Sequence, residues 1–333
     1  MKRQTIFKYN KIDFVFVAFI IAILVYYNYY ISQMAIPMWD GAVYLENARD
    51  WLKNEPLAHT HRPPLISWII AGVWSILGED WILAKYIQMI FTVGAGVLLY
   101  LTLRASKGSL FALGVTIPTM LNPQVFFWST QILTEGLSLF FLVLTLFCLK
   151  SEKQHHWFIA GVAMALTFAS RYPILLPAIA LFIAESIARK NIKLILYTMV
   201  TLVPVVILIV SAVSVKTGEF NVAIARDTEL SPVLSPYYIL NSITIFGPVF
   251  LLVPIAFLFK RTYVDRYNYA FIAWFIVSFL FWSAVSENQQ ARFMGQLMPA
   301  AYYLAVLAIE NIWRSNVFSG KALAKLRRFT LFK

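Results

Sequence analysis

Two acidic residues stand at the edges of long apolar runs, where a carboxylate is well placed to do chemistry. Asp40 follows the first apolar run, in Met38-Trp39-Asp40-Gly41, and Glu135 opens the run that ends at Leu149. A carboxylate in such a position can act as a general base that deprotonates a hydroxyl group. Asp40 is also suited to cap the helix expected over residues 40–57, because Asp is a favoured N-cap residue. At this point both interpretations of Asp40 stay open.

Three cationic residues occupy comparable positions. Lys85 lies in the first turns of the run that begins at Trp81. Arg171 separates two runs in Arg171-Tyr172-Pro173, and Arg292 opens the last run. A charge at membrane depth is costly and usually faces a cavity or a partner. The alternative for the long Lys and Arg side chains is that they reach the nearby membrane interface.

A histidine pair lies in the segment His59-Thr60-His61-Arg62-Pro63-Pro64. Two histidines two residues apart can ligate a metal ion in an extended segment. The chain offers neither a His-Glu-x-x-His spacing nor a cysteine near them, which favours a different interpretation. We expect polar groups near the lipid headgroups, one of which contacts a substrate.

The composition indicates that lipid surrounds the elements carrying these residues. Of the 333 residues, 60% are apolar and 13% are charged, whereas soluble domains are about half apolar and a quarter charged. The net charge of +12 would suggest nucleic acid as partner of a soluble chain. In a membrane protein it reflects Lys and Arg in cytoplasmic loops, so we expect no nucleic-acid partner. The single cysteine, Cys148, excludes an intrachain disulfide.

The apolar runs predict an all-α polytopic protein with about ten transmembrane helices. The first run follows a basic start and reads as an uncleaved signal anchor. An additional run, Leu65 to Gly78, is too short to cross a hydrocarbon core about 30 Å thick. It is expected to lie at the surface as an interfacial helix. The ten predicted spans cover about 14–36, 81–103, 108–127, 131–149, 156–171, 172–188, 192–214, 238–259, 267–285 and 293–311.

The distribution of charge predicts the orientation. With residues 65–78 outside, ten spans leave both termini and most of the 28 basic residues in the cytosol, as the positive-inside rule requires. Residues 37–80 then form a long extracytoplasmic first loop rich in acids, with a second outer loop at about 215–237. The sequence predicts a single domain over residues 1–333 in the plasma or inner membrane. Its basic tail, residues 312–333, is expected to rest on cytosolic lipid.

The order of these features resembles the GT-C membrane glycosyltransferases, most closely the branch of protein O-mannosyltransferases and lipid A aminoarabinose transferases. The resemblance rests on an Asp after the first span, a long outer loop, Pro63-Pro64-Leu65 before a short aromatic helix, and Glu135. It covers about residues 30–190 and continues weakly through Arg292-Phe293. Two features depart from the pattern: Gly41 stands where protein mannosyltransferases usually carry Glu, and the lumenal domain of several branches is missing.

The resemblance implies an enzyme that takes a hexosyl or pentosyl unit from a polyprenyl-phosphate carrier and transfers it, with inversion, on the outer face. Asp40 matches the first-loop catalytic acid and Glu135 the second acid. Residues expected to contact the donor or its phosphate are His59, His61, Arg62, Lys85, Arg171, Tyr172 and Arg292. The chemistry is coherent, because a carboxylate can deprotonate the acceptor while cations stabilise the leaving phosphate. A divalent cation between Asp40 and Glu135 is compatible with this chemistry but not demanded by it.

Two other functions compete with transfer. A flippase for lipid-linked sugars, or another multi-pass transporter, would also span the membrane many times. Transporters commonly show two related halves, and no such repeat is seen here. A non-catalytic assembly subunit would carry its outer acids as solvated surface. The sequence implies a polyprenyl-phosphate-linked sugar and membrane lipids as partners, and it leaves the sugar and the acceptor open.

Overall fold

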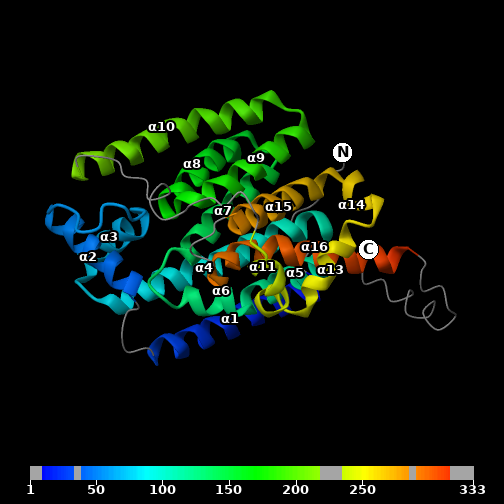
Figure 1. Cartoon of the computed structure of the whole chain (residues 1–333), viewed down its shortest axis with the longest axis horizontal. Helices are drawn as coiled ribbons and strands as arrows, with labels where there is room; N and C mark the ends of the chain where they lie inside the picture. Colours follow the sequence, from blue (N-terminus) through cyan, green and yellow to red (C-terminus); the bar gives the residue numbers. More distant parts are fainter. Residues whose placement is uncertain (1–9, 34–38, 218–234, 285–289, 316–333) are drawn as a thin grey trace.

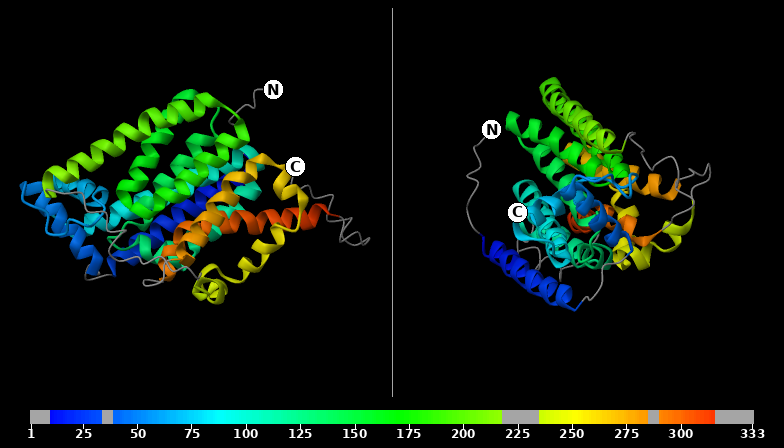
Figure 2. Two further views of the ribbon diagram at one scale, coloured as in Figure 1. Left: turned by 45° about the horizontal axis from the view of Figure 1, so that its top comes forward. Right: turned by 90° about the vertical axis from the view of Figure 1, so that its left-hand side faces the viewer.

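The computed structural model describes residues 10–33, 39–217, 235–284 and 290–315, and all regular structure in these ranges is helical. Figure 1 shows an elongated bundle with α1 and α10 along opposite sides, and Figure 2 gives two further views. Most of the predicted outer loop 215–237 and of the basic tail 312–333 lies outside the described residues.

The helices, in chain order, are α1 Lys11–Ser32, α2 Trp39–Lys53, α3 Leu65–Leu77, α4 Trp81–Lys107, α5 Ser109–Leu121, α6 Pro123–Ser129, α7 Glu135–Lys150, α8 Gln154–Ser170, α9 Leu175–Arg189, α10 Ile192–Thr217, α11 Tyr237–Leu240, α12 Ser242–Phe246, α13 Leu252–Ala256, α14 Lys260–Val264, α15 Tyr269–Ala284 and α16 Met298–Arg314. Short 3₁₀ segments are η1 Tyr172–Ile174, η3 Pro248–Leu251, η4 Arg266–Asn268 and η5 Ala291–Leu297.

Several described helices can cross a membrane, so the chain is a multi-pass all-α membrane protein. The helices α5 and α6 add a further candidate as a pair bent by 56°, where Asn122 caps α6 by accepting from the Gln124 amide at 2.8 Å. The helices α7 and α8, of 16 and 17 residues, are shorter than a usual span. The count of ten therefore stays a prediction. Among the described residues, six segments qualify singly: Lys11–Ser32, Trp81–Lys107, Tyr172–Arg189, Ile192–Thr217, Arg266–Ala284 and Ala291–Arg314.

The predicted span 238–259 is not one helix. Its residues form α11, α12, η3 and α13, which are short pieces joined by turns. Gly247 has φ +80° and is followed by Pro248. A residue in this conformation ends a helix, and proline cannot supply the next backbone N–H. Apolar composition alone could not reveal this break.

The helices α2 and α3 lie together at one end of the bundle, on the left in Figure 1. The prediction for α2 was too long, because the helix ends at Lys53 and Asn54 takes the left-handed φ of 59°. As predicted, α3 is short, and its 13 residues reach only about 20 Å. Ser67 of α3 donates to the Tyr44 carbonyl oxygen of α2 at 3.0 Å, which joins the two helices.

At the centre of the fold, α7 packs tightly against α4, and this contact fixes where Glu135 begins the helix. Of its 16 residues, 12 are buried. A Cβ atom at Gly136 would lie only 2.3 Å from Thr92 Oγ1, so the close approach requires glycine. Gln88 of α4 accepts from the Leu137 amide at 3.3 Å and thereby satisfies one of the free N–H groups in the first turn.

A set of ion pairs gathers at the other end of the bundle. Arg104 pairs with Asp13 at 2.7 Å, Lys107 pairs with Asp265 at 2.5 Å, and Lys150 pairs with Glu185. Since Glu135 and Lys150 are the first and last residues of α7, the two ends of the molecule lie about 22 Å apart along that helix. The end that carries Arg104, Lys107 and Lys150 is the one that the charge distribution predicts to face the cytosol.

Candidate active site

Asp40 lies in the first turn of α2, where two arginines from distant parts of the chain meet its carboxylate. Arg62 Nη2 donates to Oδ1 at 2.9 Å, and Arg292 Nη2 donates to Oδ2 at 3.1 Å. Arg62 comes from the segment before α3, and Arg292 comes from η5. The Asp40 side chain keeps 26% of its surface exposed, so its carboxylate is open to a ligand.

Glu135, the second predicted acid, is held in the same cluster. Arg171, which follows α8, donates to Glu135 Oε1 at 2.7 Å. Arg292 Nε lies 3.8 Å from the same oxygen atom. The guanidinium of Arg292 therefore lies between the two acids, while Glu135 is nearly covered, with 8% of its side chain exposed.

These contacts form an ion-pair chain that runs Arg62, Asp40, Arg292, Glu135, Arg171. Three guanidinium groups and two carboxylates give it a net charge of 3 − 2 = +1. The Nε–H groups of Arg62 and Arg292 are buried and have no hydrogen-bond partner among the described residues. Such donors suit an anion, because guanidinium groups match the geometry of phosphate oxygens.

Aromatic rings cover Arg171 and Arg292. Phe293 stacks on Trp282, with ring centres 4.5 Å apart. The Arg171 guanidinium lies 4.6 Å from the Phe293 ring centre, and that of Arg292 lies 5.3 Å from Trp128. A positive charge over a ring face is stabilised by the ring quadrupole, and the rings also limit the approach of water. The rings thus restrict where the two guanidinium groups can lie.

Two tyrosines adjoin the ion-pair chain. Tyr44 follows Asp40 by one turn of α2 and is buried. Burial raises the pKa of its hydroxyl, and the charges of Arg62, Glu135, Arg171 and Asp40 all act on it, so this side chain stays protonated and uncharged. Tyr172, a predicted contact residue, donates to the Arg62 carbonyl oxygen at 3.5 Å and buttresses that segment.

The predicted histidines lie beside the ion-pair chain rather than in it. His59 Nε2 is 3.0 Å from Glu46 Oε2, and the ring centre of His61 lies 6.2 Å from that of His59. The backbone of His59 exchanges two hydrogen bonds with the Asn47 side chain, at 2.9 and 3.0 Å. These bonds tie the segment that carries Arg62 to α2.

Lys85 is fully buried in α4, and its ammonium nitrogen lies 4.8 Å from the centre of the Trp81 ring. It does not enter the ion-pair chain defined above. In the described ranges, no group of three or more His, Cys, Asp or Glu residues could hold a metal ion. Between Asp40 and Glu135, where a divalent cation was one expectation, the structure has the guanidinium of Arg292.

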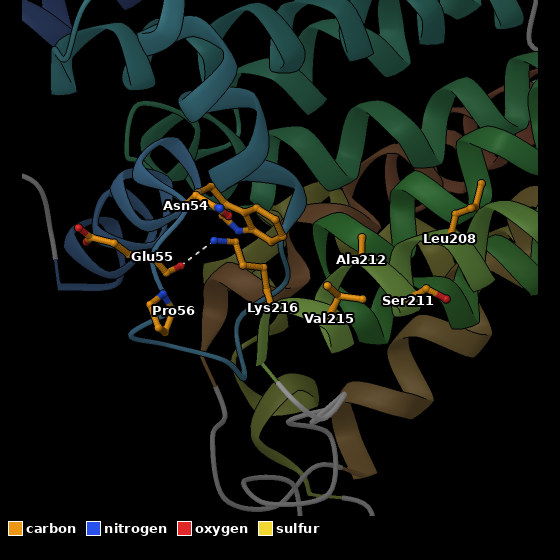
Figure 3. Close-up of a pocket in the computed structure, with 9 residues that line it drawn as sticks. Asn54, Glu55, Pro56, Leu208, Ser211, Ala212, Val215 and Lys216 are labelled. Atoms are coloured by element: carbon orange, nitrogen blue, oxygen red, sulfur yellow. Dashed lines mark hydrogen bonds between the residues drawn. The ribbon is translucent and has the colours of Figure 1, made fainter.

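A groove of about 660 Å³ lies between the end of α2 and the last turns of α10 (Figure 3). Leu208 and Val215 of α10 form an apolar, exposed wall. Lys216 donates to the Glu55 carbonyl oxygen at 2.7 Å and lies 5.4 Å from the ring centre of Trp51. Figure 3 shows the Glu55 carboxylate pointing away from Lys216. The groove is therefore amphipathic, and its positive charge, the Lys216 ammonium, points toward Trp51 and the Glu55 backbone.

Several neighbours of the ion-pair chain were not expected from the sequence. Tyr44 had a usable signal, because its spacing of four residues from Asp40 places both on one face of α2. Phe293 directly follows the predicted Arg292. Trp128 and Trp282 had none, since they approach from separate helices and their apolar surroundings resemble any other span.

The comparisons with known proteins agree with this architecture. Residues 61–215 match the family model described as dolichyl-phosphate-mannose-protein mannosyltransferase. No curated protein matches the sequence. The segment matched by the family model includes Arg62, Glu135 and Arg171, and it ends within α10.

Two solved structures share the fold. ArnT from Cupriavidus metallidurans bound to undecaprenyl phosphate gives a TM-score of 0.74 at 15% identity, covering 90% of this chain and 61% of that one. ArnT from the same organism in the apo state gives 0.72 at 14% identity, covering 92% and 62%. The chain thus spans less than two thirds of the length of these proteins. The family model and the shared fold together confirm the predicted resemblance to the GT-C membrane glycosyltransferases.

Proposed function

We propose that this protein transfers a sugar from a polyprenyl-phosphate carrier to an acceptor on the outer face of the membrane. One observation carries the proposal: a partly exposed carboxylate, Asp40, is held between two arginines in a set of charges whose sum is +1. The GT-C fold supports it, and one structure with this fold was obtained with undecaprenyl phosphate bound. The outer location rests on the distribution of basic residues.

In this reaction Asp40 is the general base. The acceptor hydroxyl attacks the anomeric carbon from the face opposite the phosphate. A new carbon–oxygen bond forms as the bond to the phosphate oxygen breaks, and the hydroxyl proton passes to Asp40. Each carboxylate oxygen has two lone pairs and gives one to an arginine. A free lone pair therefore remains to receive the proton.

The arginines of the ion-pair chain bind the phosphate. As the bond to the sugar breaks, the phosphate gains negative charge, and cations placed beforehand stabilise that charge. The buried Nε–H groups of Arg62 and Arg292 are unused donors that a phosphate oxygen can accept from. Glu135 is more covered than Asp40, and its role is to hold Arg171 and Arg292 rather than to take a proton.

The groove between α2 and α10 supports an amphiphilic substrate, because its α10 wall is apolar at Leu208 and Val215 while Lys216 of the same helix adds a positive charge. Trp51 in this groove follows Asp40 by 11 residues of α2, which is a rotation of only about 20° and a rise of about 16 Å. A molecule lying in the groove can thus extend along one face of α2 toward Asp40.

The test is sugar transfer by purified protein in proteoliposomes, measured as release of polyprenyl phosphate from a panel of carrier-linked sugars. Asp40→Asn is expected to abolish release while insertion and thermal stability stay at wild-type levels. Glu79→Gln is the matched control, because Glu79 is another outer carboxylate paired with an arginine, Arg49, and lies outside the ion-pair chain. Release at the wild-type rate by Asp40→Asn would refute the base. Carrier translocation without any release would support the flippase.

A further inference from the structure

We propose that Ser138 and Gln296 are positioning residues that set the distance between Arg292 and Glu135, a role that rests on the proposed function. Ser138 lies one turn after Glu135 in α7, and Gln296 lies about one turn after Arg292 in η5. Gln296 Nε2 donates to Ser138 Oγ at 2.6 Å. This bond therefore joins α7 to η5 about one helical turn away from the pair of Arg292 and Glu135.

The charged pair cannot fix this spacing by itself. Arg292 Nε and Glu135 Oε1 are 3.8 Å apart, whereas an N–H···O hydrogen bond has a length of about 2.7–3.2 Å. An attraction at the longer distance changes little with small movements, while a short hydrogen bond is strongly directional. Ser138 and Gln296 are also 0% and 2% exposed, so water does not compete for their contact.

The hydrogen-bond inventory of Ser138 determines the direction of the contact. The serine has one O–H group, and this group donates to the Glu135 carbonyl oxygen at 3.2 Å. Its oxygen must therefore accept from Gln296, which requires the amide nitrogen of Gln296 to face it. The result is a series of two hydrogen bonds that runs from Gln296 through Ser138 to the backbone of Glu135.

Gly295, the residue before Gln296, packs closely against another backbone. A Cβ atom at Gly295 would lie 3.0 Å from the Gln124 carbonyl oxygen of α6, so η5 lies against that backbone. With one side fixed by close packing, the Gln296–Ser138 bond decides where Arg292 lies relative to α7. Loss of the bond is expected to misplace Arg292 without unfolding the bundle.

The experiment measures kcat and KM for the lipid-linked donor, together with the unfolding temperature. Ser138→Ala and Gln296→Leu are each expected to lower kcat between about 10- and 100-fold, the usual effect of a misplacement near 1 Å, with KM changed less. The double variant should be no worse than either single variant, because both remove one bond. Ser138→Thr, which keeps the hydroxyl, should recover most of the rate.

Thr145→Val is the control, because it removes another buried hydroxyl of α7 that bonds only within the helix, to Phe141 at 2.8 Å. A wild-type kcat for Ser138→Ala, or a loss matched by Thr145→Val, would overturn the positioning role and leave the proposed function standing. Additive losses in the double variant would overturn it as well. If the wild-type protein transfers no sugar, the proposed function fails and this role fails with it.

Discussion

The contact between α7 and α4 makes a quantitative prediction about Gly136. In Gly136→Ala, the new Cβ atom would lie 2.3 Å from Thr92 Oγ1 and 3.0 Å from the Gln88 carbonyl oxygen, both in the fully buried face of α4. Ordinary contacts begin near 3.4 Å, so the two helices must separate by about 1 Å or Thr92 must leave its rotamer. Overpacking of this kind costs about 1–3 kcal/mol. The variant should lose several degrees of unfolding temperature.

The design separates steric overlap from a general effect of alanine. Gly72→Ala in α3 is the matched control, because nothing lies within 4 Å of its Cβ position and alanine is the better helix former by about 0.5–1 kcal/mol. Thr92→Ala added to Gly136→Ala removes the shortest contact and should restore more than half of the lost stability. The assay is thermal unfolding of the solubilised protein. Equal unfolding temperatures for Gly136→Ala and Gly72→Ala would refute the reasoning.

Two further predictions concern the ion-pair chain. Arg292→Lys keeps the net charge of +1 but loses the forked guanidinium, so carrier affinity should stay within about threefold while kcat falls about 100-fold. Arg292→Gln also removes the charge and should lower both carrier affinity and kcat. Equal effects of the Lys and Gln variants would contradict the argument. Asp40→Asn raises the net charge of the ion-pair chain to +2, so the variant should bind free polyprenyl phosphate on the order of tenfold more tightly than wild type. Equilibrium titration measures this affinity. Weaker binding would contradict this placement of the phosphate.

Much of the fold could be predicted because lipid imposes a simple constraint on composition. Apolar length predicted α1, α4, α7, α8, α9 and α10 and the short α3 that follows Pro64, whereas the single span predicted over 108–127 is bent between α5 and α6. The break at Gly247 and Pro248 was not predicted, since an apolar run shows that a segment is buried in lipid but not that it is continuous. Similarly, α2 ends three residues before Pro56, where Asn54 takes a left-handed conformation that its sequence merely permits.

The candidate site was predictable in part, and the reason is geometric. The position of an ionisable residue at the edge of an apolar run indicates its depth in the membrane, so Asp40, Glu135, Arg171 and Arg292 could be found singly. Depth does not give the direction in which each helix face points. The sequence therefore could not tell that Arg292 lies between both acids, or that Lys85, at a similar depth, lies over Trp81 instead.

In the proposed reaction, the order of charges in the ion-pair chain explains how one aspartate can serve as base beside two arginines. A polyprenyl-phosphate sugar is a phosphodiester with charge −1, which balances the +1 of the five side chains. When the sugar leaves, the phosphate becomes a monoester with charge near −2. At the same moment Asp40 takes the acceptor proton and becomes neutral, so the side chains rise to +2. The summed charge of the five side chains and the phosphate is zero before and after transfer. Arg62 and Arg292 lose the negative charge of Asp40 as a partner and gain that of the phosphate. A base elsewhere in the fold would leave the new phosphate charge unbalanced in a site of low dielectric constant, where that imbalance costs most.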